Sequence, residues 1–340
     1  MHIYWRDGSI TREAIDKRVV AGLGFFDGVH LGHQAILHRV EELATKSGAI
    51  PLMITFDRHP LSILSPDTVP KLLTSPTERR VYAWDLGITA VAELVFDENL
   101  ATMDAERFAS DILANRLGVI SVVAGEDFSF GHRGQGGVSL LRQEGHQWGI
   151  DTVDIVEPLF VKESKVSSTR IRNLLREGKV EEARECLGRP YRLAGPVITG
   201  EGRGRALGFP TANLAVPSDR LIPKDGVYAV TVRRAADGSS GDMKHDDHEQ
   251  KAMIGVLSIG DKPTFAGSGQ TIEVHILDKN ENYYSQKLEV SLHKWLRPTQ
   301  RFGSAGELKH QVDQDIKATR QLFTMKHTIM PGEIYTHRAL

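Results

Sequence analysis

The sequence predicts two domains: an α/β domain with a doubly wound parallel sheet, and then a mostly antiparallel β-domain. Three observations carry this prediction. The chain has 340 residues, about twice the size of a common domain. Its first half alternates short apolar runs with helical patterns, which is typical of βαβ units. Its second half contains short strand-like runs without a long helix between them, which is typical of a barrel or a sandwich.

The first half has apolar runs that are short, rich in β-branched residues and bounded by breakers, so we expect buried strands. These runs are residues 19–22, 50–56, 88–96, 119–124 and 150–156. Amphipathic patterns predict helices over residues 33–47 and 105–117, which end at Gly48 and Gly118, and Asp104 is a candidate N-cap. Ligands of such sheets bind beyond the carboxyl ends of the strands, so we expect a site there.

The middle of the chain contains the predicted domain boundary. Residues 167–187 predict two short helices that break at Gly178. The Gly-Arg-Pro triplet at 188–190 does not fit easily into a helix, which places the domains at 1–187 and 188–340.

The second half begins after this boundary and contains five further strand-like runs. We expect strands over residues 194–199, 227–233, 252–258, 271–277 and 287–293. The polar stretch 235–250 predicts a hairpin tip. A final helix follows, with a capping box of Ser304 and Glu307 and an apolar stripe of Leu308, Val312, Ile316 and Phe323.

Composition argues against several function classes. With 42 basic and 44 acidic residues, the net charge is −2 at pH 7, which argues against a general nucleic-acid binder. The only cysteine, Cys186, cannot form an internal disulfide or a cysteine-built zinc site. No apolar run is long enough to span a membrane and the N-terminus shows no secretory signal, so we expect a cytoplasmic protein.

A first candidate site joins the first strand to the first long helix, over residues 24–33 (GFFDGVHLGH). The free N–H groups of a helix N-terminus suit phosphate, and His30 and His33 can donate hydrogen bonds to charge that develops on phosphorus. Three other interpretations are weaker. A dinucleotide fingerprint lacks its third glycine, a metal site lacks an evident third ligand, and a structural turn does not explain both histidines.

A second phosphate-suited segment begins a helix late in the same half. Its residues Ser167, Ser168 and Arg172 combine hydroxyls, free helix N–H groups and a guanidinium fork. Alone, this pattern is more often an ordinary N-cap.

A second candidate site lies in the other half, where a glycine-rich loop with two arginines precedes Pro-Thr-Ala-Asn at 210–213. The Thr211 hydroxyl and the Asn213 carbonyl are hard oxygen donors that suit Mg²⁺, although these residue types also form ordinary turns. Further on, Glu273 begins a strand, where it either faces solvent or acts as a general base. No P-loop kinase motif occurs.

Motifs in both halves, taken in order, resemble bacterial bifunctional riboflavin kinase/FAD synthetases. In the first half of this chain, five segments resemble the adenylyltransferase half of these enzymes, which belongs to the HxGH nucleotidyltransferase superfamily. They are GFFDGVHLGH, ITFDRHP, KLLTSPTERR, GEDFSFGHRGQGG and VSSTRIR. The kinase module is similar to GRGRALGFPTANL, PKDGVYA, IGDKPTF, EVHILD and LRPTQRF. The resemblance departs from the family at Phe25, Arg58, Gly137 and the 235–250 insertion.

The resemblance implies roles in the first half. His30 and His33 would bind the ATP phosphates and stabilise the transition state, with Gly24, Phe26, Asp27 and Gly32 in the same ATP-binding loop. Ser167, Ser168 and Arg172 would hold the triphosphate. The flavin side would be formed by Phe56, His59, Pro60, Asp127 and Phe128.

It also implies a six-stranded antiparallel barrel with a terminal helix in the second half. Thr211 and Asn213 would bind Mg²⁺ and ATP phosphate, and Glu273 would deprotonate the riboflavin 5′-hydroxyl. Arg297 would lie near the flavin. The loop over ATP would contain Gly202, Arg203, Gly204 and Arg205.

The sequence therefore predicts an enzyme that phosphorylates riboflavin to FMN and adenylylates FMN to FAD. Its partners would be riboflavin, FMN, FAD and ATP with Mg²⁺, and neither nucleic acid nor a membrane; self-association stays open. Two alternatives are an HxGH nucleotidyltransferase with another acceptor and a flavin-binding regulatory protein without catalysis.

Overall fold

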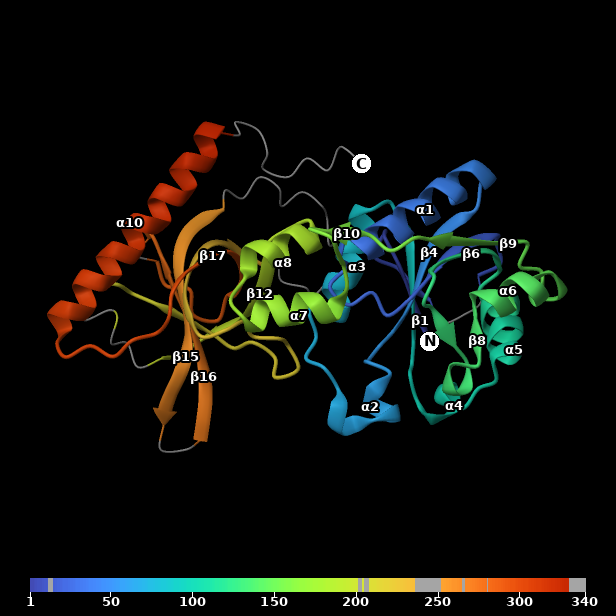
Figure 1. The fold of residues 1–340 in the computed structure, drawn as a ribbon, viewed down its shortest axis with the longest axis horizontal. Coiled ribbons are helices and arrows are strands. Elements are labelled where there is room, and N and C mark those ends of the chain that lie inside the picture. The colour runs from blue at the N-terminus through green and yellow to red at the C-terminus, as the bar shows by residue number, and fades with distance from the viewer. Residues whose placement is uncertain are drawn as a thin grey trace.

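The computed structural model describes residues 1–11, 15–200, 204, 208–235, 252–264, 267–279 and 281–329. A sheet with helices on both faces and a closed barrel lie at opposite ends of the molecule, and a pair of helices lies between them (Figure 1). Among the described helices, none has the length and apolar character that crossing a membrane requires.

The N-terminal sheet confirms the predicted α/β domain. Its strand order is β2-β1-β5-β4-β3-β6-β9. The five predicted strands pair in parallel: β3 (Val19–Leu23), β4 (Ile50–Phe56), β5 (Ala90–Leu94), β6 (Val119–Gly125) and β9 (Thr152–Val156). The sequence analysis did not identify β1 (His2–Trp5) and β2 (Ile10–Thr11), which extend one edge in antiparallel fashion. The sheet is therefore mixed, although mostly parallel.

Helices cover both faces of this sheet, as a doubly wound fold requires. Alternate residues of the strands contribute to two separate cores, so that Val20 packs with α1 (Leu31–Ser47) and Ala21 with the helix on the other face. The predicted helix over 105–117 is one turn of α-helix, α5 (Ala105–Arg107), that continues as a π-helix over Phe108–Arg116. Gly48 and Gly118 follow these helices as predicted, each with positive φ.

Shorter helices connect the strands at the edges of the domain. They are α2 (Leu61–Leu64), α3 (Pro76–Asp85), α4 (Glu98–Ala101) and α6 (Val138–Glu144). Two small hairpins, β7 (Ser129–Phe130) with β8 (Gly136–Gly137) and β10 (Phe160–Val161) with β11 (Ser164–Lys165), complete it.

The C-terminal domain is a closed, antiparallel, six-stranded barrel with the order β12-β13-β16-β15-β14-β17. Its strands are β12 (Tyr191–Ile198), β13 (Ala212–Leu214), β14 (Gly226–Arg234), β15 (Met253–Thr264), β16 (Gly267–Ile276) and β17 (Lys287–Arg297). Five correspond to predicted strands, whereas β13 falls in the Pro-Thr-Ala-Asn motif, where no strand was predicted. Because Val232 pairs with Met253, residues 235–252 connect a hairpin, but most of them lie outside the described residues.

The barrel carries the predicted terminal helix, α10 (Ala305–Ile329), on its outer side (Figure 1). The Ser304 hydroxyl accepts from the backbone N–H of Glu307, as a capping box requires. The Glu307 carboxylate accepts from the N–H of Gly303, one residue earlier than a capping box places it.

Two helices, α7 (Ser168–Arg176) and α8 (Val180–Leu187), lie between the sheet and the barrel and break at Gly178 as predicted (Figure 1). Their buried side chains, among them Ile171, Leu175 and Leu187, share one hydrophobic core with barrel residues such as Tyr191 and Val290. The first half therefore packs tightly on the second. The boundary at 187/188 stays a prediction.

Candidate functional site

The loop between β3 and α1 has an unusual backbone. Phe26, Gly28 and Val29 have φ values of 55°, 86° and 39°. Positive φ is rare for a residue with a side chain, above all for a β-branched one. At Gly28 a side chain has no room either, because a Cβ atom there would lie 2.9 Å from a methyl group of Leu73. The surrounding structure must hold this loop in place.

The two histidines lie together at the N-terminus of α1. His30 is the N-cap residue, and its Nδ1 accepts the backbone N–H of His33 at 3.3 Å. The two rings are stacked, with centroids 3.6 Å apart and planes inclined by 14°. The free N–H groups of the first helical turn therefore adjoin both imidazoles.

Burial keeps both imidazoles neutral at pH 7. It lowers the pKa of His30 to about 4, and the charge of Arg189 acts in the same direction. The pKa of His33 is also well below its usual value, because of burial and the neighbouring His30. Since Nδ1 of His30 is an acceptor, the proton of its neutral ring is assigned to Nε2, which can donate. Within the described residues, the buried Nδ1 of His33 has no hydrogen-bond partner.

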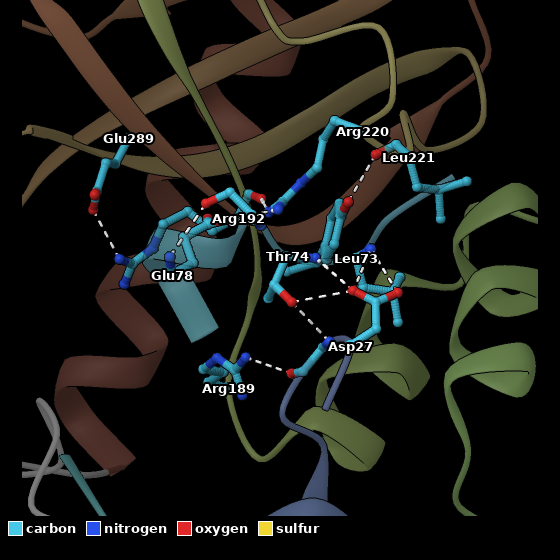
Figure 2. A network of polar contacts seen from close by, with 12 residues as sticks. Asp27, Leu73, Thr74, Glu78, Arg189, Arg192, Arg220, Leu221 and Glu289 are labelled. Carbon is cyan, nitrogen blue, oxygen red and sulfur yellow. Dashed lines mark hydrogen bonds and ion pairs between the residues drawn. The ribbon is translucent and has the colours of Figure 1, made fainter. Parts of the chain in front are cut away.

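Asp27 brings the two phosphate-suited segments together. Its buried carboxylate accepts the N–H groups of Leu73 at 2.9 Å and Thr74 at 3.0 Å (Figure 2), and the guanidinium of Arg172 at 2.5 Å. The Ser168 hydroxyl donates to the backbone carbonyl of Asp27 at 2.8 Å. Ser167 caps α7 by accepting the N–H of Arg170. The two motifs, about 140 residues apart in the chain, therefore form one site.

The predicted flavin residues follow the two strands on either side of β3. Phe56, His59 and Pro60 lie at the end of β4, where the His59 ring meets Phe25 edge-on, with centroids 4.8 Å apart. Asp127 and Phe128 follow β6. Asp127 pairs with Lys165 at 2.7 Å, which lowers the pKa of its exposed carboxyl. Because β4, β3 and β6 are parallel neighbours, all of these residues share the carboxyl edge of the sheet with His30.

Sequence reasoning missed two arginines that support this loop. Arg79 is fully buried on α3 and donates to the carbonyls of Phe25 at 3.2 Å and Phe56 at 3.0 Å. Arg189 follows α8 and donates to the carbonyls of Gly28 at 2.6 Å and Val29 at 3.0 Å. The sequence signal for Arg79 was its place within KLLTSPTERR, but its burial could not be predicted.

A second site lies on the outer face of the barrel. The Thr211 hydroxyl donates to the Glu273 carboxylate at 3.2 Å, and Asn213 is directly opposite Glu273 in the β13–β16 register. These three side chains are half-buried, whereas Ala212 and Val274 between them point into the barrel core. The pairing of β13 with β16 thus brings together residues that are 62 positions apart.

Two described glycines of the glycine-rich segment, Gly200 and Gly204, lie beside these residues. A Cβ atom on Gly200 would lie 2.1 Å from the side-chain amide nitrogen of Asn213, so a larger residue at 200 would displace the Asn213 amide. The carbonyl of Gly204 accepts the N–H of Phe209 at 2.8 Å. Gly202, Arg203 and Arg205 lie outside the described residues.

A cavity of about 140 Å³ opens beside Thr211. Its lining combines apolar and aromatic side chains, such as those of Val197, Ile276 and Tyr283, with polar ones from Thr211, Lys279, Glu281 and Asn282. Arg297, at the end of β17, forms a forked pair with the buried Asp315 of α10, at 2.9 and 2.7 Å. The structure therefore places Arg297 against the terminal helix.

The fold and the two sites define a class of protein: an α/β half and a barrel, each with its own site suited to a nucleotide phosphate. Residues 12–170 match the family model of FAD synthetase, and residues 187–323 match that of riboflavin kinase. The chain belongs to the family of bifunctional riboflavin kinase/FMN adenylyltransferases.

Its relatives match along nearly their whole length. The bifunctional riboflavin kinase/FMN adenylyltransferase of Buchnera aphidicola subsp. Schizaphis graminum is 34% identical over 92% of this chain and 96% of its own. That of Listeria monocytogenes is 36% identical over 94% and 98%. A crystal structure named macrolide-efflux protein, from Streptococcus pneumoniae, has a TM-score of 0.79 and 30% identity over 91% of this chain and 96% of its own.

Proposed function

We propose that this protein makes FAD from riboflavin in two steps, one in each domain. The barrel transfers the γ-phosphoryl group of ATP to riboflavin and releases ADP. The N-terminal domain transfers AMP from a second ATP to FMN and releases pyrophosphate. The observation that carries this proposal is that His30, His33 and Ser167 lie inside the segment that matches the FAD synthetase model, and Thr211, Asn213 and Glu273 inside the one that matches the riboflavin kinase model.

In the N-terminal domain, an FMN phosphate oxygen attacks the α-phosphorus of ATP while the bond to the bridging oxygen breaks. The FMN phosphate is already a nucleophile, so this step needs no strong base. Neutral His30 and His33 donate hydrogen bonds to phosphate oxygens, and the N-terminus of α1 adds its partial positive charge. The buried, unpartnered Nδ1 of His33, among the described residues, supports this role.

The neighbouring residues complete the phosphate site. We assign Gly24, Phe26 and Gly32 to the loop that approaches ATP, and Ser167 and Ser168 to the helix that receives its triphosphate. Arg172 joins them at the level of Asp27, whose carboxylate holds the loop together. The flavin side is formed by Phe56, His59, Pro60, Asp127 and Phe128.

In the barrel, the riboflavin 5′-oxygen attacks the γ-phosphorus and Glu273 accepts its proton. The donors here fit Mg²⁺, because a hydroxyl, an amide and a carboxylate lie on one face of two paired strands. Thr211 and Asn213 would hold this ion, which supplies charge neutralisation to the phosphates when bound. The cavity beside Thr211, which offers both apolar and polar side chains, is suited to the base of ATP. The resemblance to the family assigns Arg297 to the flavin side.

The test is to supply riboflavin, ATP and Mg²⁺ and to separate the products by chromatography. We expect FMN to form first and FAD to follow, and FMN supplied with ATP to give FAD and pyrophosphate. FMN without FAD would overturn the role of the first domain, and no use of riboflavin would overturn that of the second. A cytoplasmic location, where ATP is available, is part of the proposal.

A further inference from the structure

We propose that Arg220 of the barrel is a positioning residue for the adenylyltransfer site of the other domain. It fixes residues 71–78, here called the linking segment, which in turn hold Asp27 and the loop that carries His30 (Figure 2). This inference rests on the proposed function of the N-terminal domain and assigns a part of its site to the barrel.

The linking segment is bound to the barrel at both of its ends. The N–H of Leu72 donates to the carbonyl of Asp219 at 2.8 Å, and its carbonyl accepts the N–H of Leu221 at 2.9 Å. Glu78 receives both arms of the Arg220 guanidinium, at 2.5 and 3.1 Å. The neighbours of Arg220 in the chain therefore bind one end of the linking segment, and the Arg220 side chain binds the other end.

The next residues of the segment turn to the other domain. Leu73 and Thr74 donate their N–H groups to the Asp27 carboxylate (Figure 2). The Thr74 hydroxyl accepts the N–H of Gly28 at 2.9 Å. Neighbouring residues of an extended chain present their backbone groups to opposite sides. Leu72 can thus bind the barrel while Leu73 binds Asp27.

The His30 loop depends on such external support. Phe26 and Val29 have positive φ, a conformation that persists only where the surrounding structure over-determines it. The bonds to Asp27 and Gly28 are part of that support. If the linking segment moves, we expect the loop to relax and His30 to shift. A small displacement of a positioned group can reduce a rate by about a hundredfold.

The ion pair between Arg220 and Glu78 is shielded from solvent. The two side chains are 7% and 17% exposed. Burial alone would raise the pKa of Glu78, but the Arg220 guanidinium and the hydrogen bonds from Ser75 together outweigh burial and hold that pKa below its usual value. Arg220 also donates to the carbonyl of Arg192 at 2.5 Å, which anchors it to β12. A buried charge without its partner is strongly unfavourable, so the pair stays together.

The test compares three variants by both activities, with FMN or riboflavin supplied separately. Arg220→Gln combined with Glu78→Gln removes both charges, so no unpaired buried charge is left, and a glutamine at 78 can still serve the capping box with Ser75. Arg220→Lys keeps the charge but loses the fork. Arg192→Gln is the matched control, because Arg192 pairs with Glu289 within the barrel.

We expect the neutral pair to lower the kcat of FAD formation by about tenfold or more, with the riboflavin kinase rate unchanged. Arg220→Lys should be intermediate, and Arg192→Gln should resemble the wild type in both assays. A purely structural role of Arg220 would reduce the kinase activity of its own domain. Equal loss of both activities, or no loss of FAD formation, would overturn the proposal.

Hydrogen exchange gives a readout that does not depend on catalysis. The amides of Leu73 and Gly28 should exchange faster in the neutral pair than in the wild type, since both are bound through the linking segment. Unchanged protection would overturn the inference. A wild-type enzyme that makes no FAD from FMN would instead overturn the proposed function, and the exchange rates would still decide the role of Arg220.

Discussion

The ring of His30 lies flat against the ring of His33, with the two centroids 3.6 Å apart. Two protonated imidazoles would repel each other at this distance, and burial already disfavours their charged forms. The pair therefore offers hydrogen bonds at the start of a helix without carrying a charge of its own.

Replacing His30 by glutamine should reduce FAD formation from FMN by about 10²–10³-fold, because a donor to the transition-state phosphate is lost. FMN formation from riboflavin should stay unchanged, since the barrel has its own site. Product chromatography with each substrate measures both rates. His38→Gln is the control, because His38 is exposed on the same helix. A proportional loss of both activities in a folded variant would argue against separate sites.

Replacing Glu273 by glutamine should lower riboflavin phosphorylation by about 10²–10⁴-fold, since the 5′-hydroxyl loses its proton acceptor. FAD formation from supplied FMN should survive. Glu289→Gln serves as the control, because Glu289 is a half-buried strand glutamate of the same barrel. A kinase rate that Glu273→Gln leaves intact would rule out the general-base role.

Thr211→Val keeps the shape of the side chain and removes its hydroxyl, so it should weaken Mg²⁺ binding. We expect the Mg²⁺ concentration needed for half-maximal kinase activity to rise by about tenfold or more. The measurement is a Mg²⁺ titration of FMN formation at fixed ATP. An unchanged midpoint would exclude Thr211 as a ligand of the ion. FAD formation from separately supplied FMN, measured at the same Mg²⁺ concentrations, is the control.

Lowering the pH should destabilise the protein through His30. Its pKa is about 4 in the folded chain, against 6.5 as the ordinary value, so between these values the unfolded chain binds a proton that the folded chain does not. The free energy of unfolding should therefore fall as the pH drops from 6.5 to 4, by about 3 kcal/mol for this group. Urea unfolding of the wild type and of His30→Gln across this range measures it. Equal pH dependence of the two proteins would contradict the assignment.

Gly28→Ala should destabilise the protein by about 1–3 kcal/mol and lower FAD formation, because the added methyl group meets Leu73 and the φ of 86° is strained. Gly48→Ala is the matched control, with φ of 64° and no atom within 4 Å of the added carbon. It should be less destabilised and form FAD at the normal rate. Thermal unfolding and product analysis separate the two effects. Normal FAD formation by a folded Gly28→Ala protein would refute the importance of this loop.

The sequence analysis identified the strands that are buried on both faces, because such strands are continuous apolar runs. It missed β1 and β2, which are short: β2 is an exposed edge strand, and β1 is a four-residue strand that pairs with β2 on one side and β5 on the other. It also missed β13, since Pro, Thr and Asn are typical of turns, and only pairing with β12 and β16 makes Ala212–Leu214 a strand. No local sequence pattern indicated the π-helix over Phe108–Arg116.

In the candidate sites, features that depend on local spacing could be predicted from the sequence, whereas contacts between distant residues could not. The interval between His30 and His33 placed both residues at a helix start. The burial of Arg79 could not be foreseen, because arginine is usually exposed. The bond between Arg172 and Asp27 spans 145 positions, and that between Arg220 and Glu78 spans 142. Such pairings follow from the packing of the two halves, which no single motif contains.

Residues 187–191, which connect α8 to β12, are held by hydrogen bonds along a short, direct path. The carbonyl of Leu187 accepts hydrogen bonds from Gln34 and Arg189, and Arg189 reaches on to the carbonyl of Gly28. Two residues later, Tyr191 is already part of β12. A chimera that combines this α/β half with the barrel of a relative must therefore keep the number of residues between Leu187 and Tyr191. Residues inserted at this joint would pull Arg189 away from the carbonyls of Gly28 and Val29.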